Sequence, residues 1–241
     1  MANVLDEKTG PVNSAGQDIN VIDKQLPVTV GTGSTIFEIC LWVIPIIVAF
    51  LIPLLADVHW AVAALGIIPG LLWLYSKVKA KNYFQQLEQK LQSDASTIDN
   101  YIEQRVVILD NLASLINRAI ELDKDVMKSV AGLRSGIQEG ETRNDRAAQV
   151  DSLAGRLFPQ VEAYPELKSH QEIADAIQQN SYLQREITAA RTVYNNRVNQ
   201  WNRDVFDWPV KQIVAAHEQY TTRVPFTTTT EFKQRARNNF F

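Results

Sequence analysis

A polar stripe runs along one predicted helix near the end of the chain, in the stretch AARTVYNNRVNQWN at residues 189–202. Side chains four, seven and eleven residues apart share one face of an α-helix. Two such rows overlap here. The polar row holds Arg191, Asn195, Val198 and Asn202, and the apolar row holds Tyr194, Val198, Trp201 and Val205. Guanidinium and amide groups in this pattern could bind a ligand, take part in a reaction, or hold two helices in register.

Catalysis and metal binding find little support in the rest of the sequence. His59, His170 and His217 form neither an HxxxH nor an HExxH pair, and Cys40 is the single cysteine, so a cysteine-based metal cluster and an intramolecular disulfide are excluded. A di-metal centre in a helical bundle needs Glu-x-x-His, and the nearest match, HEQY at 217–220, has the reversed order. We therefore predict no catalytic residue, no metal and no cofactor.

The stripe is better explained as a buried polar strip that fixes the register of long helices, at some cost in stability. We expect Arg191 and the two asparagines to bond across to an earlier helix, near Arg105–Asn111. Asn195→Leu should then leave the fold intact or more stable while loosening the register. The predicted register residues are Arg105, Asn111, Arg191, Tyr194, Asn195, Val198, Trp201 and Asn202.

Length and composition restrict the class of protein further. The 241 residues carry a net charge of −3 at pH 7, so no basic field favours a nucleic-acid partner. Ten glycines and nine prolines are few for an all-β protein, and helix-favouring residues are plentiful, which predicts an all-α fold. The sequence has no Rossmann turn, P-loop or nucleophile elbow, and no small-molecule substrate is evident from it.

Residues 36–75 form a long apolar run, with Asp57 and His59 near its centre. One membrane span needs about 20 apolar residues, and this run has about twice that length. A single span would place the Asp57 carboxylate in hydrocarbon. We therefore prefer a hairpin of two spans, at about 36–55 and 58–75. The alternative is one span over about 58–75 preceded by a re-entrant or interfacial segment.

Three lysines follow the run directly, and the positive-inside rule places this end in the cytoplasm. A hairpin returns the N-terminus to the same side, so we expect a plasma or inner membrane protein with both its N-terminus and its C-terminal bundle in the cytoplasm. The predicted membrane-interface residues are Asp57, His59, Trp60, Lys77, Lys79 and Lys81.

Apolar spacing after the membrane segment predicts helices at about 77–133, 143–160, 166–206 (ended by Trp208-Pro209) and within 210–220. Residues 221–241 should be largely unfolded. The predicted class is all-α: an N-terminal transmembrane hairpin followed by an elongated antiparallel three- to four-helix bundle with coiled-coil-like packing. The predicted domains are a disordered cytoplasmic leader (1–35), the membrane segment (36–76), the cytoplasmic bundle (77–226) and a flexible tail (227–241).

Several motifs in this order carry a family resemblance. They are Ile98, Asp99, Arg105, Leu109, Asn111 and Leu112, then Tyr164, Pro165, Leu167 and Lys168, then Glu186, Ile187, Ala190, Arg191, Tyr194, Asn195, Val198, Trp201 and Asn202, and finally Trp208-Pro209. Over about residues 70–226 the chain resembles the LemA family of bacterial membrane proteins. It departs from the family in its apparent second span, and in Trp201 and Trp208, which replace smaller aromatics. The resemblance implies a membrane-tethered antiparallel helical bundle with no established enzymatic activity.

These observations favour a non-enzymatic scaffold that presents a cytoplasmic bundle to partner proteins or to a second copy of itself. Its expected partners are the lipid bilayer and other proteins, without nucleic acid or a small-molecule substrate. Two alternatives remain open. One is an oligomeric membrane conduit or a transporter accessory subunit, and the other is a metal-dependent enzyme built in the bundle core.

Overall fold

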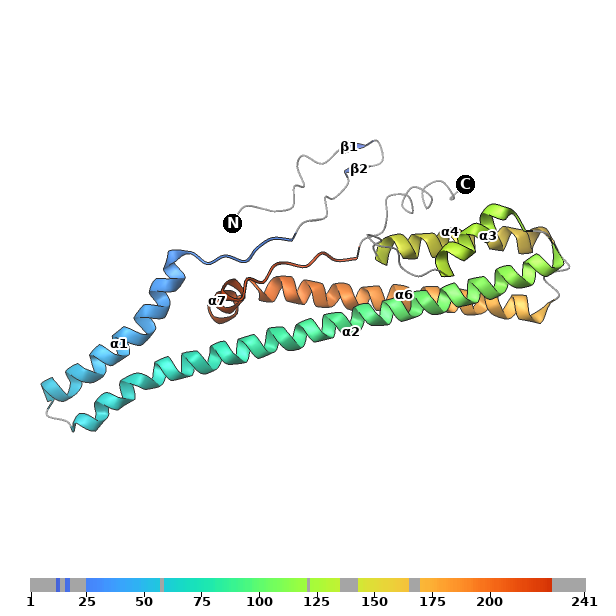
Figure 1. The fold of residues 1–241 in the computed structure, drawn as a ribbon. Helices are drawn as coiled ribbons and strands as arrows, with labels where there is room; N and C mark the ends of the chain where they lie inside the picture. The colour runs from blue at the N-terminus through green and yellow to red at the C-terminus, as the bar shows by residue number, and fades with distance from the viewer. Residues whose placement is uncertain are drawn as a thin grey trace. The chain divides into compact units, whose positions relative to one another are not determined.

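The computed structural model describes residues 12–13, 16–17, 25–56, 59–120, 122–134, 143–164 and 170–226. Figure 1 shows the elements, which are β1 (Val12–Asn13), β2 (Gly16–Gln17), α1 (Thr32–Ala56), the 3-10 helix η1 (Trp60–Ile67), α2 (Ile68–Ala119), α3 (Lys124–Arg134), α4 (Arg143–Ala163), α6 (Gln171–Asp204) and α7 (Val210–His217). Apart from the two antiparallel two-residue strands, the regular structure of the described residues is helical. The predicted all-helical class is confirmed. The predicted tail, 227–241, lies outside the described residues.

The chain forms two compact units. The first comprises Met1–Lys90 and Arg197–Val224, and the second comprises Leu91–Asn196 and Pro225–Phe241. Helices α2 and α6 each contribute to both units, because one boundary falls after Lys90 within α2 and another falls after Asn196 within α6; a third follows Val224.

In the first unit, α1 differs from a core helix of a soluble protein, which buries its apolar side chains. Most of its large apolar side chains are exposed. Residues Thr32–Leu55 are long and apolar enough to cross a membrane, and no other helix among the described residues meets that test. The helix contains Pro45 and Pro53, which are tolerated more readily in membrane helices than in soluble ones.

The apolar segment after α1 packs back against it in the antiparallel sense (Figure 1). Gly70 lies against the ring of Trp42, where an added Cβ would come within 2.4 Å of a ring carbon. Gly66 lies against Ala49 and the backbone of Pro45, where an added Cβ would come within 2.6 Å of the Ala49 Cβ. Both positions therefore require glycine for the close approach of the two segments.

The second apolar segment is not one continuous α-helix, in contrast to the continuous span predicted over 58–75. Residues 60–67 form η1, and α2 begins at Ile68. Pro69 accounts for the change, because proline is tolerated in the first turn of an α-helix and breaks its interior. Asp57, which was predicted to lie at the membrane interface, is outside the described residues.

The second unit encloses a core of apolar side chains from α2, α3, α4 and α6. Its fully buried members include Ile98, Leu109, Leu112, Ile116 and Leu157. These positions carry the apolar periodicity from which the helices were predicted, and the burial of such a stripe is the main source of helix stability.

The single helix predicted over 77–133 is wrong at its C-terminal end, because α2 stops at Ala119 and α3 starts at Lys124. Polar side chains accept hydrogen bonds from the backbone at this break. The Asn117 Oδ1 accepts a hydrogen bond from the Leu122 N–H (3.1 Å), and the Asp123 Oδ1 accepts one from the Asp125 N–H (3.0 Å). Asp123 thus satisfies an N–H that the start of α3 leaves unpaired, and Asn117 holds the connection between the two helices.

After α7 the chain turns at Gln219, whose φ of 58° lies in the left-handed region. The Tyr220 N–H donates to the Ala215 carbonyl (2.9 Å), which completes the C-terminal turn. Residues 220–226 are then extended. The prediction that the chain is largely unfolded from 221 onward is therefore wrong for residues 221–226.

Replacing glycine with alanine should have opposite effects on stability at two positions, Gly70 and Gly155. Gly70→Ala should destabilise the protein by about 1–3 kcal/mol, because the new methyl group meets the Trp42 ring. Gly155→Ala in α4 should stabilise it by up to about 1 kcal/mol, since nothing lies within 4 Å of the new Cβ. The measurement is the thermal unfolding midpoint of the full-length protein in lipid nanodiscs. A stabilised Gly70→Ala protein would contradict the observed packing of α2 against α1.

Candidate functional site

In the first unit, part of the polar stripe on α6 binds the extended segment that follows α7. The Asn202 Nδ2 donates to the Arg223 carbonyl (2.8 Å), and its Oδ1 accepts from the Arg223 N–H (2.8 Å). The adjacent residue of α6 also binds this segment, because the Trp201 Nε1 donates to the Thr221 carbonyl (2.8 Å). The Arg223 guanidinium also lies over the Trp201 ring, 4.8 Å from its centroid. This end of the stripe is therefore occupied by the protein's own backbone.

In the second unit, the stripe residue Asn195 binds Phe226 in the same way. Its Nδ2 donates to the Phe226 carbonyl (3.0 Å), and its Oδ1 accepts from the Phe226 N–H (2.8 Å). The Phe226 ring packs edge-on against Tyr194, with centroids 5.1 Å apart. The Arg191 guanidinium lies over the Phe226 ring, 5.7 Å from its centroid. The side chain and the backbone of Phe226 are thus both held by α6.

These contacts correct the predicted role of the two asparagines. Cross-helix hydrogen bonds to Arg105–Asn111 were expected, and that expectation is wrong for Asn195 and Asn202, whose amides pair with the backbone of residues 226 and 223. Asn111 is exposed on α2. Val198 and Trp201 are buried, in agreement with their place in the apolar row.

Arg105, one of the predicted register residues, is 4% exposed and paired with two other helices. Its Nε donates to the Asn180 Oδ1 (2.7 Å), and its Nη1 forms an ion pair with Asp151. Arg105 therefore connects α2 to both α4 and α6. Burial lowers the pKa of Arg191, an effect that the Asp151 carboxylate opposes and the positive charge of Arg105 reinforces.

The segment before α1 also binds the extended segment after α7, within the first unit. Pro27 and Thr221 form an antiparallel β-bridge. The Val28 N–H donates to the Tyr220 carbonyl (3.1 Å), and the Thr222 N–H donates to the Leu26 carbonyl (2.9 Å). Backbone pairing of this kind fixes where the chain enters α1.

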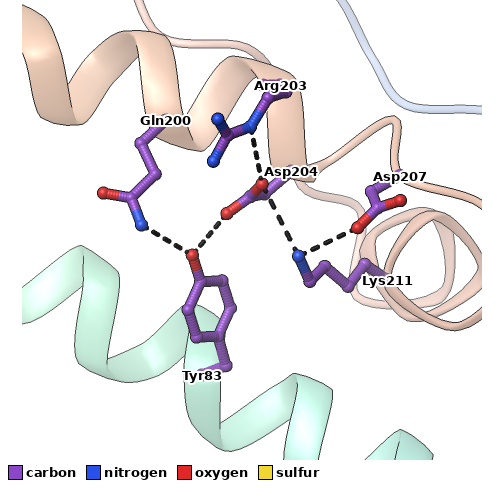
Figure 2. Close-up of polar contacts among 6 residues, drawn as sticks. All are labelled: Tyr83, Gln200, Arg203, Asp204, Asp207 and Lys211. Atoms are coloured by element: carbon purple, nitrogen blue, oxygen red, sulfur yellow. Dashed lines mark hydrogen bonds and ion pairs between the residues drawn. The ribbon is translucent and has the colours of Figure 1, made fainter.

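A second polar cluster of the first unit joins α2, α6 and α7 (Figure 2). We call it the Asp204 clasp and define it as Tyr83, Gln200, Arg203, Asp204, Asp207 and Lys211. The Tyr83 hydroxyl donates to the Asp204 carboxylate and accepts a hydrogen bond from the Gln200 Nε2 (2.8 Å). Lys211 lies between two carboxylates, 3.5 Å from an Asp204 oxygen and 2.9 Å from an Asp207 oxygen.

The electrostatics of the clasp argue against acid–base chemistry. Burial acts to raise the pKa of Asp204, but hydrogen bonds from Tyr83 and Arg203 and the charge of Lys211 outweigh it, so the pKa is lowered. Burial and the hydrogen bond to Asp204 raise the pKa of Tyr83. Partial burial opposes the shift of Lys211, yet Asp207 and Asp204 raise its pKa. All three pKa values move away from neutrality, whereas a catalytic acid or base works best near the operating pH.

The residues predicted at the membrane interface have separate surroundings. Lys77 forms an ion pair with Glu38 (2.8 Å), Lys81 forms one with Glu218 (2.8 Å), and Lys79 is exposed. His59 is exposed, and the side chain of Trp60 is not among those described. Within the described part of the chain, no three His, Cys, Asp or Glu side chains come together as a metal site.

Sequence reasoning missed most of the clasp. Asp207 and Lys211 are four residues apart, a spacing at which helical side chains can pair, so this contact could have been proposed from the sequence. Tyr83 and Asp204 are 121 residues apart. Nothing in either local pattern indicates that contact, because tertiary packing alone brings the two together.

A family comparison identifies the chain. A model of the LemA family matches residues 94–240, which is more than half of the sequence, and the chain therefore belongs to the LemA family. No curated protein matches the sequence. The match includes the α6 stripe and the extended segment that it binds.

Replacing Asn195 should weaken the hold on Phe226. Asn195→Ala leaves the Phe226 N–H and carbonyl without their protein partners, which should cost about 1–3 kcal/mol. Asn196→Ala is the matched control, because Asn196 is the exposed neighbour on the same helix. Hydrogen exchange of a peptide covering 220–226 should accelerate in the first variant and not in the second. Unchanged exchange in Asn195→Ala would contradict the assigned pairing.

Removing the Asp204 charge should destabilise the protein in a pH-dependent way. Asp204→Asn should cost about 2 kcal/mol near neutral pH, because the 4% exposed carboxylate loses charge-assisted hydrogen bonds. A carboxyl whose folded pKa is lowered contributes stability above its unfolded pKa of about 3.9 and loses it as the pH falls through the folded pKa. The gap in melting temperature between wild type and variant should therefore narrow below about pH 4.

The matched control is Asp207→Asn, which removes a charge from the other carboxylate beside Lys211. Its side chain is 53% exposed, so the cost should stay below about 1 kcal/mol. Equal losses in the two variants at neutral pH would show that burial does not make Asp204 the central group of the clasp.

Proposed function

We propose that this LemA-family protein is a membrane-anchored, non-enzymatic scaffold. In this proposal, a two-span helical hairpin anchors the chain in a plasma or inner membrane. The helices that follow form a bundle on the cytoplasmic side, where they bind partner proteins or a second copy of the chain.

One observation carries the two-span topology, namely the β-bridge between Pro27 and Thr221. Residues directly before α1 are hydrogen-bonded to residues after α7, so both must lie on the same side of any membrane. If α1 crosses the bilayer, the chain has to cross back before it reaches α7. The segment formed by η1 and the start of α2 packs antiparallel to α1 and supplies that return.

Exposed apolar surface supports the anchor itself. Side chains such as Phe50, Leu54, Leu71 and Leu72 are exposed on α1 and on the first turns of α2. A soluble protein rarely exposes so large a contiguous apolar surface. Further along α2, burial in the bundle takes over from Ala80 onward, and Phe84 is fully buried. One uninterrupted helix thus passes from the proposed membrane segment into the folded bundle.

The polar clusters support a structural role over a reactive one. Arg105 is bonded to Asp151 and Asn180, and the Asp204 carboxylate is bonded to Tyr83 and Lys211. These groups use their hydrogen bonds to join helices. A scaffold needs this kind of rigid internal bonding, since it acts through the surface that it holds in place.

Cysteine labelling in a Cys40→Ser background tests the anchor. Single cysteines at Thr29, His59 and Tyr182 are treated with a membrane-impermeant maleimide in sealed vesicles of each orientation. We expect Thr29→Cys and Tyr182→Cys to react in inside-out vesicles and His59→Cys to react in right-side-out vesicles. Labelling of positions 29 and 182 from opposite sides would overturn the two-span anchor, and labelling of all three from one side would show that α1 does not cross.

The scaffold role is tested on the full-length protein by crosslinking in its native membrane followed by native mass spectrometry. The expected result is a complex of fixed stoichiometry, with a second copy or with another protein. A strictly monomeric protein without a stoichiometric partner would contradict the scaffold role even if the labelling supports the anchor.

A further inference from the structure

Trp208 is exposed in a place where a large aromatic side chain is unfavourable in water. It lies in the turn between α6 and α7, and 54% of its surface is exposed. Among the described residues of 197–224, it is the one large apolar side chain in the exposed class. Its ring contacts Phe37 near the start of α1, with centroids 5.2 Å apart.

Phe37 lies at the edge of the apolar surface of the anchor. Its ring also contacts Trp73 of α2, with centroids 5.5 Å apart. The Trp73 Nε1 donates to the Glu38 carboxylate (3.0 Å), which pairs with Lys77. Aromatic rings beside a charged pair, at the ends of two apolar segments, are typical of the headgroup layer of a membrane. The exposed apolar side chains of the anchor continue from Ile36 along α1.

The turn that carries Trp208 is held in place from within the bundle. Lys211 pairs with Asp204 at the end of α6 and with Asp207, the residue directly before Trp208. Figure 2 shows these two contacts on either side of the Lys211 ammonium. The Asp207 N–H also donates to the Asp204 carbonyl (3.1 Å), and the Gln212 N–H donates to the Asp207 carbonyl (2.9 Å). The backbone of the turn is therefore fixed while the indole remains outside.

We propose that the indole of Trp208 lies in the headgroup layer of the membrane and seats the α6–α7 turn on the lipid surface. The proposal rests on the proposed membrane anchor and adds a lipid contact made by the bundle itself. Tryptophan suits this layer because its ring is largely apolar and its N–H can bond to water or lipid oxygens. The contact with Phe37 makes the exposed indole of Trp208 continuous with the apolar surface of the anchor.

Quenching of tryptophan fluorescence by brominated phosphatidylcholine tests the proposal on the full-length protein in liposomes. The emission of Trp208 is obtained as the difference between wild type and Trp208→Phe, a conservative surface change. Trp42→Phe gives the corresponding component for a residue within α1. Tyr182→Trp adds a control indole on α6 at a position that is also 54% exposed.

We expect brominated lipid to reduce the Trp208 and Trp42 components and to leave the component gained in Tyr182→Trp unchanged. A Trp208 component as insensitive as the Tyr182→Trp control, beside a quenched Trp42 component, would overturn the lipid contact and leave the anchor standing. Such a result would indicate that Trp208 faces water or a protein partner. Loss of quenching for Trp42 as well would instead overturn the anchor on which the proposal rests.

Discussion

The backbone of the extended segment after α7 needs hydrogen-bond partners that its own conformation cannot supply. In a helix these groups pair internally, whereas an extended segment must pair with another part of the protein or with water. Within the first unit, Asn202, Trp201 and the residues before α1 provide those partners. The aromatic contacts of Tyr220 with Phe84 and Trp201 depend on the same placement. Loss of this segment would therefore expose the aromatic core and release the chain that enters α1.

The α2 helix meets two different environments within the first unit without a break in its backbone. Its first turns carry exposed apolar side chains, and burial becomes regular from Ala80 through Phe84 and Leu87. Lys77 lies at the change from one pattern to the other and pairs with Glu38 of α1. A flexible linker would let the proposed anchor and the folded part move independently. The continuous helix and the ion pair together join this apolar segment to the rest of the unit.

Much of the helical architecture follows from patterns that the sequence displays. The apolar periodicity that predicted α4, α6 and the main part of α2 corresponds to side chains that are buried in the structure. Two features departed from prediction for identifiable reasons. At the break between α2 and α3, Asp123 caps the start of α3 and Asn117 accepts a hydrogen bond from the connection, so the periodic pattern is interrupted without a proline. The segment at 221–226 shows no apolar periodicity from which its structure could be predicted. Its backbone is held by side chains of α6 and by the chain before α1.

The two asparagines of the stripe bind backbone, whereas their position on a helix predicts a side-chain partner on another helix. A buried polar residue on a helix suggests a partner on another helix, which is how such residues fix register in coiled coils. An asparagine amide, however, carries a donor and an acceptor side by side, and it can therefore pair with both the N–H and the carbonyl of one extended residue. Leucine offers neither group, and an ionised aspartate would accept from the N–H but repel the carbonyl oxygen. Asn202 with Arg223 and Asn195 with Phe226 both use the complete pair, so the residue type at each position is explained by the backbone that it binds.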